Sequence, residues 1–157
     1  MPEQTYFEQA DTLKEALYRM ACLYLGSESA AVDAVDEAIY KGYLARRKLR
    51  NKEYFSTWLM RILINVCHDE LRRGQRELAS DTVPETAAEV YDALPLKEAI
   101  RHLPEELRCV IILRYFDGFT LNETARTLNL PVGTVSSRQR KALQLLKLEL
   151  TDEEVPT

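Results

Sequence analysis

The sequence predicts an all-α protein made of two small helical domains joined by a flexible acidic linker. Apolar residues recur every three to four positions over most of the 157 residues, which is the repeat of helices with one buried face. Only five residues are glycine and 46% are hydrophobic, a composition typical of a folded, helix-rich chain. Residues 77–95 lack a lasting apolar repeat and are polar and acidic, with two prolines. We therefore expect domains at residues 1–76 and 96–150, followed by an acidic tail at 151–157.

The first two helices have candidate start and stop signals. Thr5 to Glu8 have the spacing of a capping box, which would start a helix that Gly26 ends. Ser29 would cap the second helix. The apolar face of that helix would consist of Val32, Val35, Ile39 and Tyr43. Asp33, Glu37 and Leu44 would then point outward together. Such a carboxylate pair is usually a solvated face, but it can also dock a basic partner.

The helix expected at residues 57–73 carries one narrow polar stripe. At 100° per residue, four polar side chains fall within about 60° of one another, and Trp58 begins the same stripe. These four are Arg61, Asn65, His68 and Arg72. The remaining positions are nearly all apolar, so this helix must be buried on most sides. A ring for base stacking, arginines for phosphates and an amide for a base edge suit single-stranded or melting nucleic acid. Taken alone, however, Trp58 is more simply a core residue.

The second domain should begin with two short helices. Its first apolar face would consist of Leu96, Ala99, Ile100 and Leu103. Pro104 would then open a helix that ends at Gly118, with Glu105 and Glu106 at the positive end of its dipole.

Residues Thr120 to Lys141 predict a helix, a tight turn and a second helix. Thr120 and Glu123 form a second capping-box pattern, Asn129 suits a left-handed turn and Pro131 suits the start of the next helix. The buried seam of that helix would consist of Val132, Val135, Ala142 and Leu146. The opposite side gathers small polar and basic residues, namely Gly133, Ser136, Ser137, Arg140 and Lys141, with Thr134 at its edge and Arg138 on a flank. Hydroxyl and cationic groups on one helix face bind base edges and phosphates, so we interpret this face as entering the DNA major groove. The ordinary alternative is a solvated helix face.

Charge distribution supports nucleic-acid binding although the net charge is −4. Residues 41–76 contain 10 Lys and Arg against 3 Asp and Glu, and residues 100–150 contain 8 against 5. Phosphate attraction acts locally through such basic segments. The stretch from Arg46 to Lys52 is the most basic of them.

Other classes of protein find little support. The chain lacks the apolar run of roughly 20 residues that spans a bilayer and the pattern of a secretion signal, so we expect it in the cytoplasm. Its three cysteines are scattered and only two histidines are present, which argues against a zinc site or a disulfide framework. Cys67 and His68 are neighbours, but they point about 100° apart on a helix and make a poor catalytic pair. We expect no cofactor and no catalytic residues.

With these motifs in place, the chain resembles the extracytoplasmic-function (group IV) sigma factors of bacterial RNA polymerase. Residues 103–118 and 130–138 are similar to region 4 of this family, a helix-turn-helix domain. Residues 33–39, 55–59 and 69–73 are similar to region 2, a helical bundle. This order of blocks implies an alternative sigma factor that binds core polymerase, selects promoters and promotes strand opening.

The resemblance also implies roles for individual residues. Region 2 would recognise and melt the −10 element through Leu49, Arg50, Asn51, Phe55, Trp58, Arg61, Asn65 and Arg72. It would bind the clamp helices of the largest polymerase subunit through Asp33, Asp36, Glu37 and Tyr40. Region 4 would bind the −35 element through Thr134, Ser136, Ser137, Arg138, Arg140 and Lys141, and would contact the flap of the second-largest subunit. An anti-sigma factor is a further implied partner.

Four positions depart from the family pattern. In region 4, Ser136 stands where many members have a basic residue and Gln139 where they often have an apolar one. In region 2, Asp36 replaces a commonly seen Gln and Val32 replaces an acid. A helix-turn-helix regulator that acts without polymerase is the alternative function. This alternative gives no function to the basic stretch from Arg46 to Lys52 or to the polar stripe of the helix at residues 57–73. A small enzyme using Cys67 or His68 lacks a partner residue.

Overall fold

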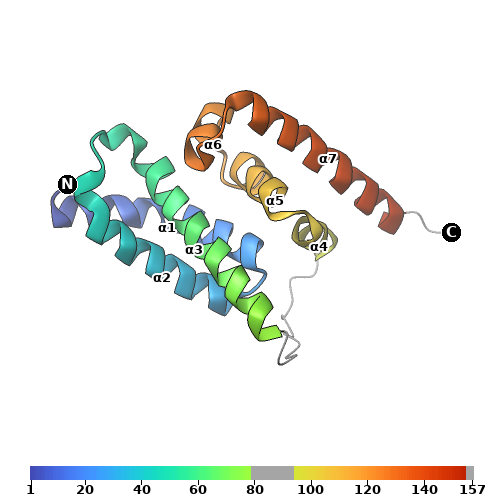
Figure 1. The fold of residues 1–157 in the computed structure, drawn as a ribbon, viewed down its shortest axis with the longest axis horizontal. Helices are drawn as coiled ribbons and strands as arrows, with labels where there is room; N and C mark the ends of the chain where they lie inside the picture. The colour runs from blue at the N-terminus through green and yellow to red at the C-terminus, as the bar shows by residue number, and fades with distance from the viewer. Residues whose placement is uncertain (79–93, 155–157) are drawn as a thin grey trace. The chain divides into compact units, whose positions relative to one another are not determined.

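The computed structural model describes the backbone of residues 1–78 and 94–154 and the side chains of residues 1–74 and 95–149. All regular structure in these ranges is helical (Figure 1), which confirms the predicted all-α fold class. The chain divides into two compact units, Met1–Glu85 and Thr86–Thr157.

The first unit is a bundle of three long helices. These are α1 (Glu3–Leu25), α2 (Glu28–Ala45) and α3 (Phe55–Leu78), and each packs against the other two. Two short 3₁₀ turns, η1 (Arg46–Lys48) and η2 (Lys52–Tyr54), connect α2 to α3. The largest fully buried side chains of this unit are Tyr6, Leu17, Met20, Leu59, Met60 and Leu63.

The predicted N-caps of the first two helices are wrong, by three residues for α1 and by two residues for α2. Helix α1 begins at Glu3 with Pro2 as its N-cap, so Thr5 lies inside the helix and caps nothing. Helix α2 is capped by Ser27, whose hydroxyl accepts a hydrogen bond from the backbone N–H of Ala30 at 3.2 Å. Gly26 does end α1, with a left-handed backbone at φ 74°.

The buried face of α2 consists mostly of small residues, and of the predicted apolar residues Val35 is fully part of it. Its buried positions are Ala31, Ala34, Val35, Ala38 and Gly42. Val32 is 45% exposed, so its assignment to the apolar face is wrong. The small residues let α2 approach α1 closely, and this rotates Val32 toward solvent.

Helix α2 approaches side chains of α1 and α3 tightly at Gly42. A Cβ atom at this position would lie 2.4 Å from Tyr6 Oη and 2.9 Å from Leu59 Cδ1. Tyr6 is fully buried, its hydroxyl donates to the backbone carbonyl of Ile39 at 2.6 Å, and burial raises its pKa to about 12. The tyrosine ring therefore has no room to move aside without breaking this hydrogen bond.

We expect Gly42→Ala to lower the free energy of unfolding of the first unit by about 1–3 kcal/mol, because the added methyl group overpacks the crossing. Gly74→Ala is the matched control, since a Cβ there meets no atom within 4 Å and should stabilise α3 by up to about 1 kcal/mol. Denaturant unfolding followed by the fluorescence of Trp58, the single tryptophan, measures both. Equal stabilisation by the two substitutions would contradict the tight crossing.

In the described part of the second unit, residues 94–154, the chain forms four α-helices. These are α4 (Leu94–His102), α5 (Glu105–Ile111), α6 (Leu121–Leu128) and α7 (Val132–Glu154). Helix α5 continues directly into a π-helical turn, η3 (Ile112–Phe116). Helices α4, α5 and α6 all pack against α7. The core where α5, α6 and α7 meet contains Val110, Ala125 and Val135, with Leu121, Leu128 and Leu130 packed against it.

The helix-turn-helix signals predicted from the sequence are confirmed. Thr120 accepts a hydrogen bond from the backbone N–H of Glu123 at 3.0 Å, and the Glu123 carboxylate accepts one from the backbone N–H of Thr120 at 2.8 Å. Asn129 ends α6 in the left-handed conformation, with φ 56° and ψ 50°. The predicted linker differs at its edges, since residues 77–78 belong to α3 and residues 94–95 to α4. Its remaining residues, 79–93, lie outside the described residues. Likewise α7 extends through residues 151–154 of the predicted tail, and residues 155–157 are not described.

Candidate nucleic-acid interfaces

The polar stripe of α3 is exposed as the wheel predicts. Arg61, Asn65 and Arg72 are exposed, and His68 is half-buried. The other faces of the helix are held in the core by Leu59, Met60, Leu63, Ile64, Val66 and Cys67. Because packing on these faces fixes the rotation of α3, the stripe is presented to solvent as a row of side chains with a defined orientation.

The two aromatic residues at the start of α3 differ in accessibility. Phe55 is only 5% exposed, and its ring packs edge-on against Tyr6 with the centroids 5.8 Å apart. The prediction that Phe55 contacts DNA is therefore wrong, because its ring belongs to the core between α1 and α3. Trp58 is half-buried and lies 5.9 Å from Phe55, so its ring rests on the core while part of it remains accessible.

The basic loop before α3 is anchored at both ends. At its start, Arg46 donates to the backbone carbonyls of Met1 at 3.2 Å and Tyr43 at 2.9 Å, and its guanidinium lies 4.1 Å from the Tyr43 ring centroid. At its end, Asn51 Oδ1 accepts a hydrogen bond from the backbone N–H of Glu53 at 3.0 Å. Arg46 is thus a structural residue, a role that the sequence did not reveal.

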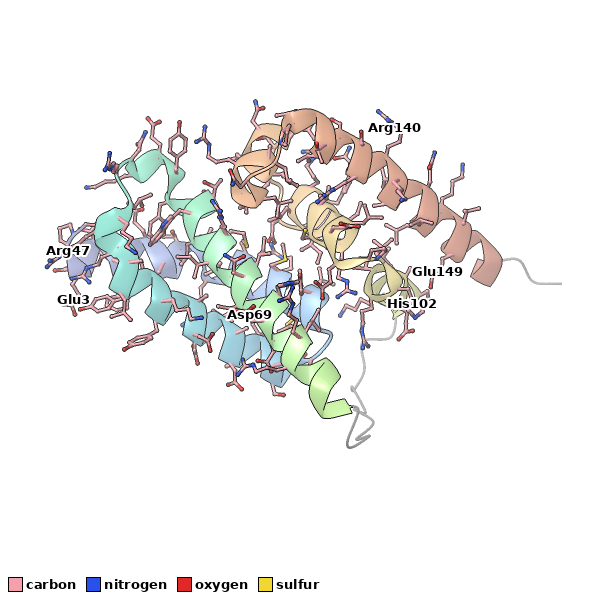
Figure 2. All side chains as sticks on the ribbon, viewed as in Figure 1. Glu3, Arg47, Asp69, His102, Arg140 and Glu149 are labelled. Atoms are coloured by element: carbon pink, nitrogen blue, oxygen red, sulfur yellow. The ribbon has the colours of Figure 1, made fainter. Side chains whose placement is uncertain are left out.

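Between these anchors the cations of the loop face solvent. Arg47, Lys48, Arg50 and Lys52 are exposed, and Figure 2 shows Arg47 at the edge of the first unit. Leu49 is half-buried. The loop therefore presents a cluster of positive charge at the start of α3, where the Trp58-headed stripe begins.

A separate acidic surface lies on α2 and extends to α1. Asp33, Asp36 and Tyr40 are exposed, and Glu37 forms an ion pair with Lys41 at 3.1 Å. Asp36 also borders a groove of about 410 Å³ between the two helices. The groove is lined by Asp11, Lys14, Glu15, Tyr18, Val32, Val35 and Asp36. The contribution of α1 was not predicted, because no local pattern indicates which face of α1 lies beside Asp36.

The outer face of α7 gathers the predicted polar and basic residues. Gly133, Ser137, Arg140 and Lys141 are exposed, and Figure 2 shows Arg140 projecting from α7 on the side opposite α5. Thr134, Ser136 and Arg138 are half-buried. The face therefore combines hydroxyl groups near the start of α7 with two cations one turn later.

The buried seam of α7 is confirmed except at its first residue. Val135, Ala142 and Leu146 are buried. Val132 is 41% exposed, so its place in the seam is wrong. It is the first residue of α7, ahead of the point where Val135 enters the core with α5 and α6. Arg138 lies on the flank, with Nη2 3.9 Å from the carboxylate of Glu106 on α5.

Two of the three cysteines, Cys67 and Cys109, have buried thiols. Burial raises the pKa of Cys67 to about 12 and that of Cys109 to about 11, so both thiols stay protonated at neutral pH. Within the described ranges, we find no cluster of three metal-ligating side chains. In the same ranges, none of the helices combines the length and apolar content that crossing a membrane requires.

Comparisons with known proteins match both units. Residues 10–77 match the model of Sigma-70 region 2, and residues 99–148 match that of Sigma-70 region 4. The RNA polymerase sigma factor SigV of Bacillus subtilis is 31% identical over 147 residues, which cover 90% of this chain and 89% of the relative. The ECF RNA polymerase sigma-E factor of Escherichia coli K12 is 34% identical over 134 residues, covering 73% and 70%. The chain belongs to the ECF sigma factors of RNA polymerase.

Solved structures show the same fold. The sigma factor RpoE of Bartonella quintana, determined in complex with the anti-sigma factor NepR, superposes with a TM-score of 0.79 at 22% identity and covers 94% of this chain. CnrH, determined in complex with the cytosolic domain of CnrY, gives a TM-score of 0.74 and covers 98%.

Membership of the ECF sigma factors gives the two units their general roles. Sigma factors are non-enzymatic initiation factors that bind core RNA polymerase and promoter DNA. The protein is thus an alternative sigma factor whose first unit corresponds to region 2 and whose second corresponds to region 4.

Proposed function

We propose that this sigma factor opens promoters by capturing melted DNA on the stripe of α3 while α7 holds the upstream duplex. The observation that carries this proposal is the stripe itself. A helix whose opposite face is buried exposes a row of Arg61, Asn65 and Arg72, and solvent-facing cations precede it in the loop. The row and the loop cations lie next to each other in the sequence and are both exposed, so together they can bind the phosphates and bases of one strand.

For the first unit, we propose a division of labour along the stripe. Arg47, Lys48 and Arg50 attract the phosphates, Trp58 stacks on a base, and Asn65 hydrogen-bonds the edge of a flipped base of the −10 element. Arg61 and Arg72 pair with the backbone on either side of Asn65 along the helix. Phe55 supports Trp58 from within the core instead of contacting DNA.

For the second unit, we propose that α7 lies in the major groove of the −35 element. Ser136, Ser137, Arg140 and Lys141 face the bases and phosphates, as hydroxyl and cationic side chains do in other helix-turn-helix proteins. Thr134 lies at the start of this face. Arg138 contacts phosphate from the flank, which requires exchange of its long 3.9 Å ion pair with Glu106.

Core polymerase is proposed to dock on the acidic surface of α2 through the clamp helices of its largest subunit. Asp33, Asp36 and Glu37 provide negative charge, and the exposed rings of Tyr40 and Tyr18 provide apolar area beside it. A partner helix with an apolar ridge between basic residues complements such a surface. The second unit is proposed to contact the flap of the second-largest subunit, and the protein would act in the cytoplasm with the polymerase.

Asp36→Lys is expected to weaken binding to core polymerase by about 1–3 kcal/mol, because it places a positive charge against a basic partner. Asp36 is exposed, so the fold should be unaffected. Glu8→Lys is the matched control, since Glu8 is an exposed acid of α1 outside the groove whose carboxylate accepts a hydrogen bond from Gln4. Competition against a labelled sigma factor measures both affinities, and equal weakening by both substitutions would contradict the docking site.

An anti-sigma factor is a further proposed partner. Both structural neighbours were determined as complexes, RpoE with the anti-sigma factor NepR and CnrH with the cytosolic domain of CnrY. A protein that covers the acidic surface of α2 would compete directly with polymerase. A regulator that works without polymerase is not favoured, because it leaves the region 2 unit unexplained.

Reconstitution with core polymerase and a library of promoter sequences tests the whole proposal. Transcripts that depend on this protein should start downstream of a shared pair of elements, one upstream and one at the melted segment. If the protein binds core polymerase without redirecting the start sites, or binds duplex DNA equally well without polymerase, the proposal fails.

A further inference from the structure

Arg114 joins three elements of the second unit. Its Nε donates to the side-chain oxygen of Gln139 on α7 at 2.8 Å, and its Nη1 donates to the backbone carbonyl of Phe119 at 2.7 Å. Arg114 itself belongs to the π-helical turn η3 and is half-buried. One guanidinium therefore connects the end of α5, the turn before α6 and the middle of α7.

The turn that Arg114 holds sets the start of α6. The backbone N–H of Phe119 donates to the carbonyl of Leu113 at 2.8 Å, and the Phe119 ring is buried. Both backbone polar groups of Phe119 are thus bonded to residues of η3. Thr120 follows immediately and caps α6. The position of the first helix of the helix-turn-helix consequently depends on η3 and on Arg114.

Gln139 lies directly beside the residues of α7 that face outward. It is three positions after Ser136, which makes the two neighbours on the helix surface, and it immediately precedes Arg140. Its side chain is half-buried and lies on the same helix side as Val135, four positions earlier. A hydrogen bond from a guanidinium is charge-assisted and geometrically restrictive, so it limits how α7 can rotate or slide against α5 and α6.

The geometry points to Arg114 and Gln139 as positioning residues for promoter recognition. We propose that the hydrogen bond between Arg114 and Gln139, called the Arg114–Gln139 latch below, fixes the placement of α7. This placement would set the ratio between the affinity for the upstream element and the affinity for other sequences. The inference rests on the proposed role of α7. Hydrogen bonds to base edges depend steeply on distance and angle. Electrostatic attraction to phosphates is long-ranged and changes little when the helix shifts slightly. Loosening the latch should therefore reduce specific binding more than non-specific binding.

The decisive comparison uses Gln139→Leu and Gln139→Glu in the full-length protein assembled with core polymerase. Leucine has similar size and no acceptor, whereas glutamate retains the acceptor oxygen. Affinity is measured for one duplex with the selected upstream element and for one with that element scrambled, over a range of salt concentrations. For Gln139→Leu we expect the ratio of the two affinities to fall roughly five- to 50-fold. The affinity for the scrambled duplex and its salt dependence should be unchanged, and Gln139→Glu should keep the wild-type ratio.

Arg114→Lys provides a second route if Gln139→Leu perturbs folding. Lysine keeps the positive charge but lacks the planar fork that reaches two acceptors, so it should reproduce the loss of discrimination. An unchanged ratio in both loosened variants would overturn the inference, as would equal loss on both duplexes. A fall of the ratio in Gln139→Glu as large as that in Gln139→Leu would also overturn it, because glutamate keeps an acceptor oxygen for Arg114. If the wild-type holoenzyme prefers no upstream sequence, the proposed function of α7 fails instead.

Discussion

Asn65→Ala is expected to lower the equilibrium constant for promoter opening roughly five- to 150-fold, which corresponds to about 1–3 kcal/mol. Binding to core polymerase should stay unchanged. The side chain is exposed on α3 between Arg61 and His68, so its removal leaves no buried cavity. What is lost is the amide that bonds the edge of a melted base. Permanganate reactivity of the −10 element reports opening, and competition against labelled sigma factor reports polymerase binding.

An abasic nucleotide at the position that Asn65 reads makes this test specific. With the wild-type protein, removing the base should reduce promoter opening as much as Asn65→Ala does. With the Asn65→Ala protein, removing the base should cause no further reduction. Arg73→Ala is the control on the same helix, because its guanidinium pairs locally with Glu70 at 2.5 Å. Loss of polymerase binding without a defect in opening would refute the role proposed for the stripe.

Arg140→Ala is expected to lower the affinity for the preferred upstream element by about 1–3 kcal/mol and to relax specificity at one base pair. Its guanidinium projects from the outer face of α7, one turn beyond Ser136 and Ser137 (Figure 2). Arginine pairs well with two acceptors of a guanine edge, so the loss should concentrate on a single position of the element. Selection of binding sequences by each holoenzyme measures this change.

Lys147→Ala gives the same change of charge on the same side of α7, about 10 Å further along the axis. Lys147 is exposed, and we expect a smaller loss that is equal for every sequence. If Arg140→Ala also weakens all sequences equally, Arg140 is a phosphate contact and the base-reading role is excluded.

Local signals in the sequence predicted the helix-turn-helix best. The capping box at Thr120 and Glu123 and the left-handed turn at Asn129 depend on residues within four positions of each other. Such interactions form in the same way wherever the segment lies. The starts of α1 and α2 were predicted less well, since Ser27 and Ser29 are both suitable caps and Pro2 lets α1 begin before Thr5.

The candidate surfaces that consist of one helix face were predicted from helical periodicity alone. The stripe of α3 and the outer face of α7 follow from one helix each, and they are exposed as expected. Phe55 was assigned to DNA through the resemblance to region 2, whereas its ring packs against Tyr6, which lies 49 positions earlier in the sequence. The groove between α1 and α2 was missed because it depends on which faces two helices turn toward each other.

The amino-acid sequence by itself determined the helical class, the turn chemistry and the polar rows of α3 and α7, because helical periodicity and capping act over a few residues. Tertiary structure alone decided the close crossing at Gly42, the burial of Phe55 and the bond between Arg114 and Gln139, which lie 25 positions apart. These contacts depend on how whole helices pack, and packing selects partners by shape and distance that no short stretch of chain specifies.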